Sequence, residues 1–217
     1  MSLPHLKRPH ASLAPNTKPP LLILLHGFGS NEADLFSFAD ALDERFLVLS
    51  PRAPRTLPQG GYAWFDLGFR PDGSLTHAPE QVLAAQQGLI SFIREVIAAY
   101  DADPTRVYLL GFSQGAMMSA LVALTEPKLI AGAVMMSGLI PAEVQPLIAP
   151  PEQLKSLRLF LGHGIGDEVV PIAEGRAAHA LLDSLHVQHE YCEYPIGHHF
   201  SDESLDDILG WLSKRIQ

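Results

Sequence analysis

The sequence Val-Tyr-Leu-Leu-Gly-Phe-Ser-Gln-Gly-Ala occupies residues 107–116 and joins an apolar run to a Gly-x-Ser-x-Gly motif. The run has the length of a buried strand, and residues 116–124 are almost entirely apolar, which is typical of a helix packed on a sheet. A sharp turn between such a strand and such a helix forms a nucleophile elbow, in which flanking glycines relieve clashes and a serine hydroxyl is lifted out of the sheet. The motif makes Ser113 the candidate nucleophile; the alternative is a capping serine in an ordinary glycine-rich turn.

Short apolar runs alternate with helical patterns on both sides of this motif. Most of the runs do not alternate in polarity, as expected for parallel strands that are covered on both faces. The order of the elements predicts an α/β fold with a mostly parallel central sheet and helices on both faces. Strands are expected at 21–25, 46–50, 107–111, 131–136, 157–161 and 187–194, and helices at 32–42, 79–100, 114–125, 171–185 and 201–216.

Length and composition narrow the class of protein. The 217 residues suffice for one sizeable core, so a single domain over 1–217 is expected, with the proline-rich residues 1–20 as an irregular lead-in that has room for a short edge strand. A formal net charge of -9 opposes a phosphate-binding surface, so nucleic acid is not an expected partner. Cys192 is the single cysteine, which favours a reducing compartment and predicts a cytoplasmic location. The longest aliphatic run, residues 21–25, falls far short of the ~20 residues of a membrane span, so no stable membrane insertion is expected.

Two further candidate residues follow other expected strands. Parallel sheets carry their chemistry at the carboxyl ends of the strands, and Asp167 and His198 lie just beyond two such ends. A serine hydroxyl needs a histidine to accept its proton and a carboxylate to hold that histidine, so these residues complete a set with Ser113. The alternatives are a helix N-cap for Asp167, and a surface loop or a metal ligand for His198. The sequence has neither an HExxH motif nor clustered cysteines, so no metal is assigned.

The oxyanion of an acyl-transfer intermediate needs two backbone N–H donors. The usual positions are the residue after the serine and one residue in the loop after an earlier strand, which are Gln114 and Phe28 here. Alternatives for the Phe28 loop are an ordinary βα turn or a phosphate-binding loop. A Gly-Lys-Ser/Thr sequence does not follow the loop, which disfavours phosphate binding.

The substrate pocket is the least specified part of the site. Trp64 and Phe65 lie in the long segment 51–79, and long connections are commonly functional, so both are candidate pocket residues. Anchoring of that segment on the core is an equally good interpretation of two large aromatic side chains. Leu139 follows another expected strand end and is a further candidate pocket residue.

Taken together, these motifs resemble those of the phospholipase/carboxylesterase family of α/β-hydrolases, which includes acyl-protein thioesterase-like enzymes. The matching stretches are Leu-Leu-His-Gly-Phe-Gly-Ser-Asn at 24–31, Pro-Arg-Ala-Pro at 51–54, Ala-Trp-Phe-Asp at 63–66, Gly-Phe-Ser-Gln-Gly-Ala at 111–116, Ser-Gly at 137–138, His-Gly-Ile-Gly-Asp-Glu-Val-Val-Pro at 163–171 and Tyr-Pro-Ile-Gly-His at 194–198. The doubled histidine at 198 and 199 departs from the family's pattern.

The resemblance implies an α/β-hydrolase fold, hydrolysis of carboxylic esters or acyl thioesters without a cofactor, and catalytic Ser113, Asp167 and His198. The expected function is a carboxylesterase acting on small-molecule esters with short to medium acyl chains, since the chain has no identifiable cap domain. Acyl-thioesterase and lysophospholipase activities are alternatives. A serine peptidase and a non-catalytic binding protein on the same fold are weaker ones.

Overall fold

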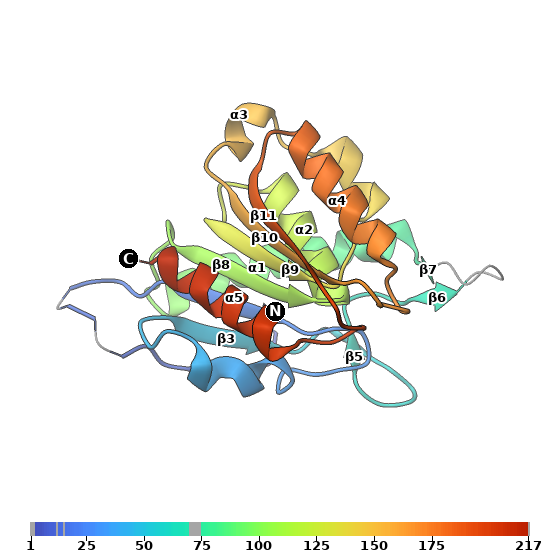
Figure 1. The fold of residues 1–217 in the computed structure, drawn as a ribbon. Helices are drawn as coiled ribbons and strands as arrows, with labels where there is room; N and C mark the ends of the chain where they lie inside the picture. The colour runs from blue at the N-terminus through green and yellow to red at the C-terminus, as the bar shows by residue number, and fades with distance from the viewer. Residues whose placement is uncertain (1–2, 12, 15, 70–74, 217) are drawn as a thin grey trace.

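The computed structural model describes residues 3–11, 13–14, 16–69 and 75–216, and its centre is a seven-stranded sheet (Figure 1). The strand order is β1-β3-β2-β8-β9-β10-β11. Strand β1 pairs antiparallel with β3 at one edge, and every other pairing in this sheet is parallel. The bounds are β1 (His5–Arg8), β2 (Leu21–Leu25), β3 (Leu47–Pro51), β8 (Val107–Phe112), β9 (Gly132–Met136), β10 (Arg158–Gly164) and β11 (Gln188–Tyr194). The predicted mostly parallel sheet is confirmed.

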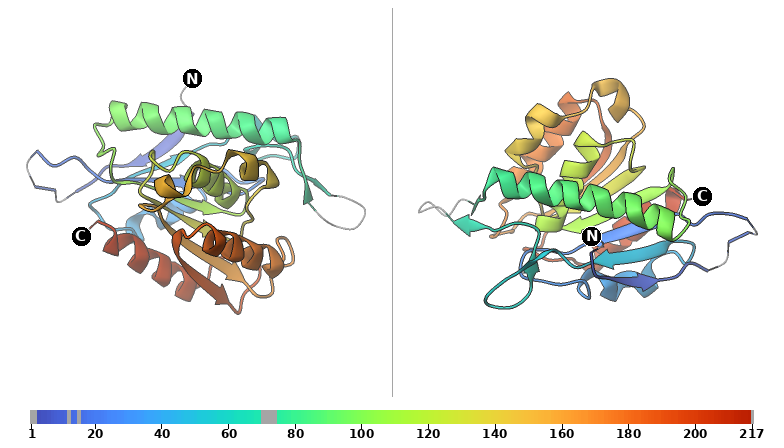
Figure 2. Two further views of the ribbon diagram at one scale, coloured as in Figure 1. Left: turned by 90° about the horizontal axis from the view of Figure 1, so that it is seen from above. Right: turned by 180° about the vertical axis from the view of Figure 1, so that it is seen from behind.

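Helices cover both faces of the sheet, and each face has its own core. Successive residues of a strand point to opposite faces, so Leu21, Ile23 and Leu25 pack in one cluster and Leu22 and Leu24 in the other. The first cluster lies under α1 (Pro79–Ala99), α2 (Gln114–Thr125) and α4 (Ile172–Ser184). The second lies under η1 (Leu35–Ala41) and α5 (Asp202–Lys214). Figure 2 shows α1 and α5 on opposite sides of the sheet.

Helix α1 is the one helix in the described part of the chain that is long and apolar enough to cross a membrane by length and composition alone. Its apolar residues recur at helical spacing, and Val82, Leu89, Ile93 and Val96 are all buried in the first core cluster. Its hydropathy is therefore explained by packing against the sheet.

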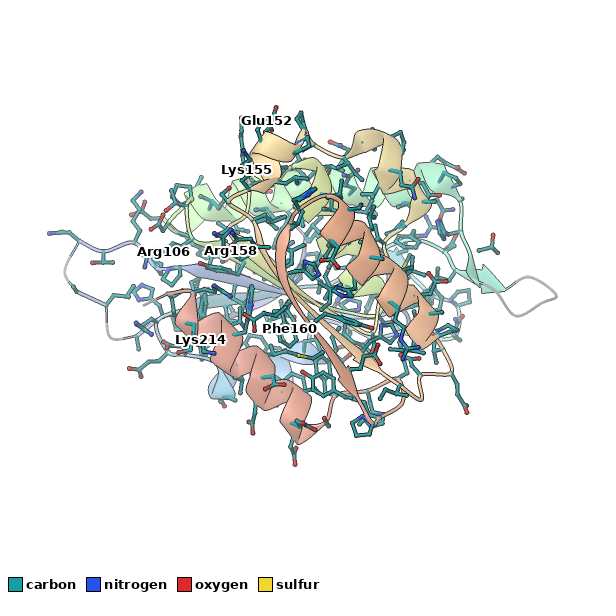
Figure 3. The ribbon with its side chains drawn as sticks, turned by 45° about the horizontal axis from the view of Figure 1, so that its top comes forward. Arg106, Glu152, Lys155, Arg158, Phe160 and Lys214 are labelled. Atoms are coloured by element: carbon teal, nitrogen blue, oxygen red, sulfur yellow. The ribbon has the colours of Figure 1, made fainter. Side chains whose placement is uncertain are left out.

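Helix α5 is fixed at both ends by side-chain interactions. At its start, Ser201 and Ser204 form a reciprocal capping box. Acidic residues occupy its first turn and Lys214 its last (Figure 3), an arrangement that complements the helix dipole. Its buried Trp211 meets Phe160 of β10 edge-on, with ring centroids 6.2 Å apart.

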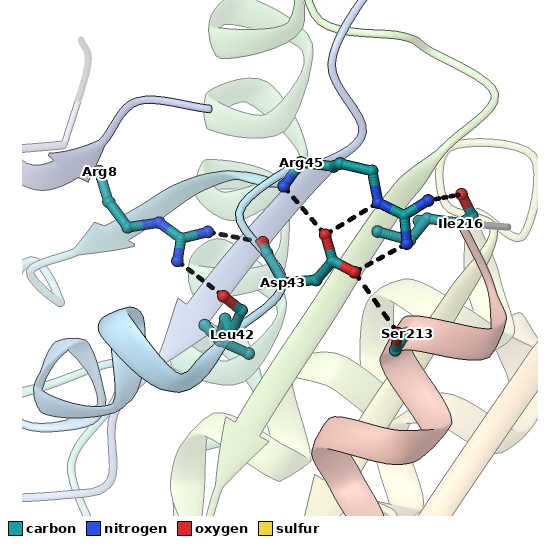
Figure 4. Close-up of polar contacts among 6 residues, drawn as sticks. All are labelled: Arg8, Leu42, Asp43, Arg45, Ser213 and Ile216. Atoms are coloured by element: carbon teal, nitrogen blue, oxygen red, sulfur yellow. Dashed lines mark hydrogen bonds and ion pairs between the residues drawn. The ribbon is translucent and has the colours of Figure 1, made fainter. Parts of the chain in front are cut away.

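A polar network holds the carboxyl end of α5 against the loop that precedes β3 (Figure 4). The Arg45 guanidinium donates to both carboxylate oxygens of Asp43, at 2.9 and 2.7 Å, and to the carbonyl of Ile216 at 3.2 Å. The Ser213 hydroxyl of α5 donates to Asp43 at 3.4 Å. On the other side of the loop, Arg8 of β1 donates to the carbonyl of Asp43 at 2.8 Å.

Two segments differ in detail from the expectation. The helix expected at 32–42 is the shorter 3-10 helix η1, because Asn31 Oδ1 accepts the N–H of Ala33 and forms a turn where the helix would begin. The long segment 51–79 contains two short hairpins, β4 (Arg55–Thr56) with β5 (Tyr62–Ala63) and β6 (Gly68–Phe69) with β7 (Leu75–Thr76). The short helices η2 (Ala142–Leu147) and α3 (Pro151–Leu154) precede β10.

Candidate active site

Ser113 lies at a strained turn between β8 and α2. Its φ of 53° and ψ of -115° are unusual for a residue with a side chain. The flanking glycines are required by close backbone approach: a Cβ on Gly115 would lie 1.8 Å from the carbonyl oxygen of Leu25, and one on Gly111 would lie 2.2 Å from that of Gly115. The Ser113 N–H donates to Met136 of β9 at 2.9 Å, which ties the turn to the neighbouring strand. The local geometry is that of the elbow expected from the sequence.

Asp167 follows β10 and is buried, with 6% of its surface exposed. One carboxylate oxygen accepts the backbone N–H groups of Val169 and Val170 at 2.9 and 2.8 Å. The other oxygen lies 2.7 Å from Nδ1 of His198. Helix α4 has Pro171 at its N-cap, so Asp167 is not the cap of that helix. The carboxylate instead holds its own loop with one oxygen and the histidine ring with the other.

His198 follows β11 in a loop that packs tightly against the Asp167 loop. A Cβ on Gly164 would lie 2.3 Å from the carbonyl oxygen of Gly197, so only glycine fits there. A carboxylate oxygen accepts hydrogen bonds, so His198 Nδ1 donates to Asp167 and, in the neutral ring, Nε2 carries the lone pair. The ring lies against Phe112, the residue before Ser113, with centroids 4.9 Å apart. His199 is exposed.

The loop after β2 lies beside the elbow. A Cβ on Gly27 would lie 3.4 Å from the Cβ of Ser113, which places the backbone next to Phe28 against the serine turn. The Gln114 side chain is buried and binds a different loop: its Oε1 accepts the N–H of Trp64 at 2.9 Å, and its Nε2 donates to the carbonyl of Phe65 at 2.7 Å. Gln114 therefore couples the elbow to the 51–79 segment through its side chain.

His26 supports the loop after β2, although its residue type and position gave it no predicted role in the sequence. It is fully buried, and burial lowers the pKa of its imidazole. Its Nδ1 donates to the carbonyl of Gly27 at 2.8 Å, while Nε2 accepts the N–H of Ala53 at 3.1 Å. The Trp64 indole donates to the His26 carbonyl at 3.0 Å. A neutral ring in this tautomer holds the segments at 26–29 and 53–64 together.

Comparison with known proteins identifies the family of the chain. The phospholipase/carboxylesterase family model matches residues 12–216. The chain belongs to this family. The relatives of this α/β-hydrolase include a protein of Oryza sativa named as a probable inactive carboxylesterase, 31% identical over 95% of this chain and 88% of the relative, and an acyl-protein thioesterase of Neurospora crassa, 29% identical over 95% of this chain and 94% of the relative. The crystal structure of an esterase named PE8 superposes with a TM-score of 0.84 at 26% identity and covers 99% of both chains.

A narrow pocket in this hydrolase-family chain lies beside the first turn of α2 and has a volume of only about 10 Å³. Leu139 and Ile140 line it together with Ala116, and His163 is the one titratable side chain among its described lining residues. Gly138 sets its depth near the elbow, because a Cβ there would lie 2.5 Å from the Cβ of Ala116 and 3.1 Å from the carbonyl oxygen of Ser113. Leu139, a candidate substrate residue, thus shares a pocket with Ala116 in the first turn of the helix that follows the candidate nucleophile.

Trp64 and Phe65 lie elsewhere. Both side chains are buried in the first core cluster, with exposed fractions of 2% and 0%. A larger surface groove of about 590 Å³ touches Trp64, but its lining includes Pro54 and residues 80–89 of α1. The contacts of both residues match the anchoring interpretation, and their part in substrate binding remains a prediction from the sequence.

Proposed function

We propose that this chain is a carboxylesterase in which Ser113, His198 and Asp167 form the catalytic triad. The observation that carries the proposal is the 2.7 Å hydrogen bond from His198 Nδ1 to the buried Asp167, next to the strained turn that presents Ser113. This bond orients the lone pair of Nε2 for proton transfer, which is the role of the histidine in serine hydrolases. Because one relative is named as inactive, family membership by itself does not make this member an enzyme.

In the proposed mechanism, Ser113 Oγ attacks the carbonyl carbon of the ester, and its proton passes to His198 Nε2. Asp167 stabilises the resulting imidazolium, and the backbone N–H groups of Phe28 and Gln114 stabilise the oxyanion. Collapse of the intermediate breaks the bond to the alcohol, which leaves with the proton from His198, and the acyl group stays on Ser113. A water molecule then attacks the acyl-enzyme in the same way, releasing the acid and restoring the serine.

The test is covalent labelling of purified protein with a fluorophosphonate probe, followed by peptide mapping. We expect one label on Ser113, and Ser113→Ala should lose both the label and hydrolysis of p-nitrophenyl esters. Ser137 offers a matched control, since it directly follows the neighbouring strand β9 and has the same φ of 53°. Ser137→Ala should keep the label on Ser113. A label on another serine, or normal hydrolysis by Ser113→Ala, would reject the assignment.

An acyl thioesterase is the second candidate, favoured by the similarity to the Neurospora crassa thioesterase over almost the full length of both chains. The acyl half of the mechanism is the same for both substrates, and the leaving group alone differs. A panel of esters, acyl thioesters and lysophospholipids with one common acyl chain separates the candidates by kcat/KM. The cytoplasmic location and the single domain over 1–217 stay predictions from the sequence.

A further inference from the structure

Three side chains that commonly bind metals meet between α4 and the edge strand β11. His179 and Asp183 lie one helical turn apart on α4, and His189 is the second residue of β11. One donor atom from each residue lies within 4.8 Å of the other two. His189 Nε2 is 2.7 Å from His179 Nδ1 and 3.7 Å from a carboxylate oxygen of Asp183, whose other oxygen is 3.7 Å from His179 Nε2.

This cluster is separate from the candidate active site. His189 lies at the start of β11, whereas His198 follows Tyr194 at the end of the same strand. At about 3.3 Å per residue, the strand places roughly 17 Å between His189 and Tyr194. Metal binding at this cluster is therefore independent of the proposed hydrolysis.

The two imidazole rings are already oriented. His189 is 95% buried as a side chain, with 5% exposed, and its Nδ1 lies 2.8 Å from the carbonyl oxygen of Val187. Because a carbonyl only accepts, Nδ1 carries the proton and Nε2 is left as a lone pair. The His179 ring stacks on Tyr191, with centroids 4.6 Å apart and planes at 15°. A backbone carbonyl that fixes the second nitrogen of a histidine is the usual support of a metal ligand.

Counting protons shows that the cluster lacks a donor when both rings are neutral. His179 has one proton to share between two positions. If the proton is on Nδ1, it satisfies His189, but the lone pair on Nε2 faces the Asp183 carboxylate. If the proton is on Nε2, it faces the carboxylate, but two nitrogen lone pairs then meet at 2.7 Å. A cation removes the conflict in the second case, because Nδ1 of His179 and Nε2 of His189 then both offer it a lone pair.

We propose that His179, Asp183 and His189 bind one divalent transition-metal ion, such as Zn²⁺, with water completing the coordination. Two imidazoles and one carboxylate suit Zn²⁺ and its neighbours better than Mg²⁺ or Ca²⁺, which prefer oxygen ligands. Ligand nitrogens around a tetrahedral Zn²⁺ with bonds of about 2.0 Å lie roughly 3.3 Å apart, so the two rings must separate slightly. His179 is 38% exposed and can make that adjustment. The ion would tie α4 to the edge strand whose far end leads into the His198 loop.

Zinc titration of the full chain by calorimetry, after dialysis against a chelator, tests the site. The wild-type protein should bind one Zn²⁺ per chain, and Asp183→Asn and His179→Ala should weaken that binding at least tenfold. Both positions are partly exposed, so these variants should fold, which circular dichroism checks. His199→Ala is the matched control, because it removes an exposed histidine outside the cluster and should bind Zn²⁺ normally.

A second readout follows the stability of the fold. Zinc at 100 times its Kd should raise the Tm of the wild type and of His199→Ala by about 5 °C or more, and that of Asp183→Asn by far less. A chelator should lower the Tm of the zinc-loaded protein without changing its rate of ester hydrolysis. Absence of saturable binding, wild-type affinity in Asp183→Asn and His179→Ala, or a loss of rate on chelation would each overturn the proposal.

Discussion

The backbone at Ser113 holds a conformation that costs about 1–3 kcal/mol for a residue with a side chain. The same positive φ recurs at Ser137, which directly follows β9. Both turns are held by surrounding backbone: the Ser113 N–H donates to Met136, and the Ser137 N–H donates to Gly162, each at 2.9 Å. Packing of β8, β9 and β10 therefore determines where both hydroxyls lie.

Replacement of the two adjacent histidines tests which is the general base. His198 Nδ1 is bonded to Asp167 and its ring lies on Phe112, whereas the side chain of His199 is exposed. We expect His198→Ala to lower kcat/KM by at least ~10³-fold, because loss of a triad member leaves only binding and oxyanion stabilisation. His199→Ala should stay within a few-fold of wild type. The reverse pattern in correctly folded variants would assign the base to His199.

Gln114 joins the elbow to the 51–79 segment, and its removal should destabilise the protein. In Gln114→Ala the buried N–H of Trp64 and the carbonyl of Phe65 lose their partners, each of which costs about 1–3 kcal/mol. We expect the free energy of unfolding in urea to fall by about 2–4 kcal/mol. Gln87→Ala, at an exposed position of α1, should change it by less than about 0.5 kcal/mol. Equal stability of the two variants would show that the Gln114 hydrogen bonds contribute little.

For single residues, the sequence predicts those that lie at strand ends better than those whose side chains support them. Ser113 and Asp167 follow apolar strands and His198 follows the more polar edge strand β11, so the topology of a parallel sheet brings all three to one edge. The sequence does not indicate which way an aromatic side chain points. Pocket lining and anchoring on the core were therefore equally good interpretations of Trp64 and Phe65. His26 directly follows a buried strand, and that position was the available sign of its supporting role.

Among the elements, the buried parallel strands are the best predicted. A short, continuous apolar run in a chain with a large net charge is typical of a strand that is covered on both faces. Segments ordered by local side-chain bonds are predicted less well. The turn closed by Asn31 shortens η1, and the hairpin of β4 and β5 depends on pairing with residues near Ser30. Neither effect appears in the periodicity of hydrophobic residues.

The network at the end of α5 predicts a pH-dependent stability. Hydrogen bonds from the Arg45 guanidinium lower the pKa of Asp43 to about 2, so folding favours the ionised carboxylate. Its stabilising contribution is fully present above the unfolded pKa near 4 and is lost as the pH falls from about 4 towards 2. At pH 6, Asp43→Asn should lower the Tm by about 2–4 °C, the shift expected for roughly 1 kcal/mol.

Thermal unfolding of the wild type and Asp43→Asn between pH 7 and pH 3 checks this expectation. The difference in Tm should shrink below pH 4, because the wild type then loses the interaction that the variant already lacks. Asp101→Asn is the control: its ion pair with Lys18 is exposed, and its Tm should stay within about 1 °C of wild type at every pH. A constant difference for Asp43→Asn across the range would mean that the carboxylate charge is not the stabilising feature.

Across the whole molecule, the two ends of the parallel sheet carry different chemistry. The carboxyl ends of β8, β10 and β11 lead into the loops with Ser113, Asp167 and His198, while the proposed metal site lies at the opposite end of β11. A parallel sheet imposes this separation, because every strand and its following loop point the same way. The order of the strands in the sheet was not predictable in detail, since it depends on the face of the sheet over which each connection crosses.

The pocket beside the elbow predicts the preferred size of the acyl chain. Its volume is only about 10 Å³, so Leu139 and Ile140 leave no room for a long aliphatic chain unless they move, and chains of short to medium length should be preferred. Along a series of p-nitrophenyl esters, kcat/KM should peak at short to medium chains and fall towards palmitoyl.

Leu139→Ala should move the optimum to longer chains, because it removes a wall of the pocket. One buried CH₂ is worth about 0.8 kcal/mol, so the rate ratio between neighbouring chain lengths should change by roughly fourfold. Leu147→Ala, at an exposed position of η2, should leave the optimum unchanged. An optimum at palmitoyl in the wild type would instead indicate that long acyl chains bind outside this pocket.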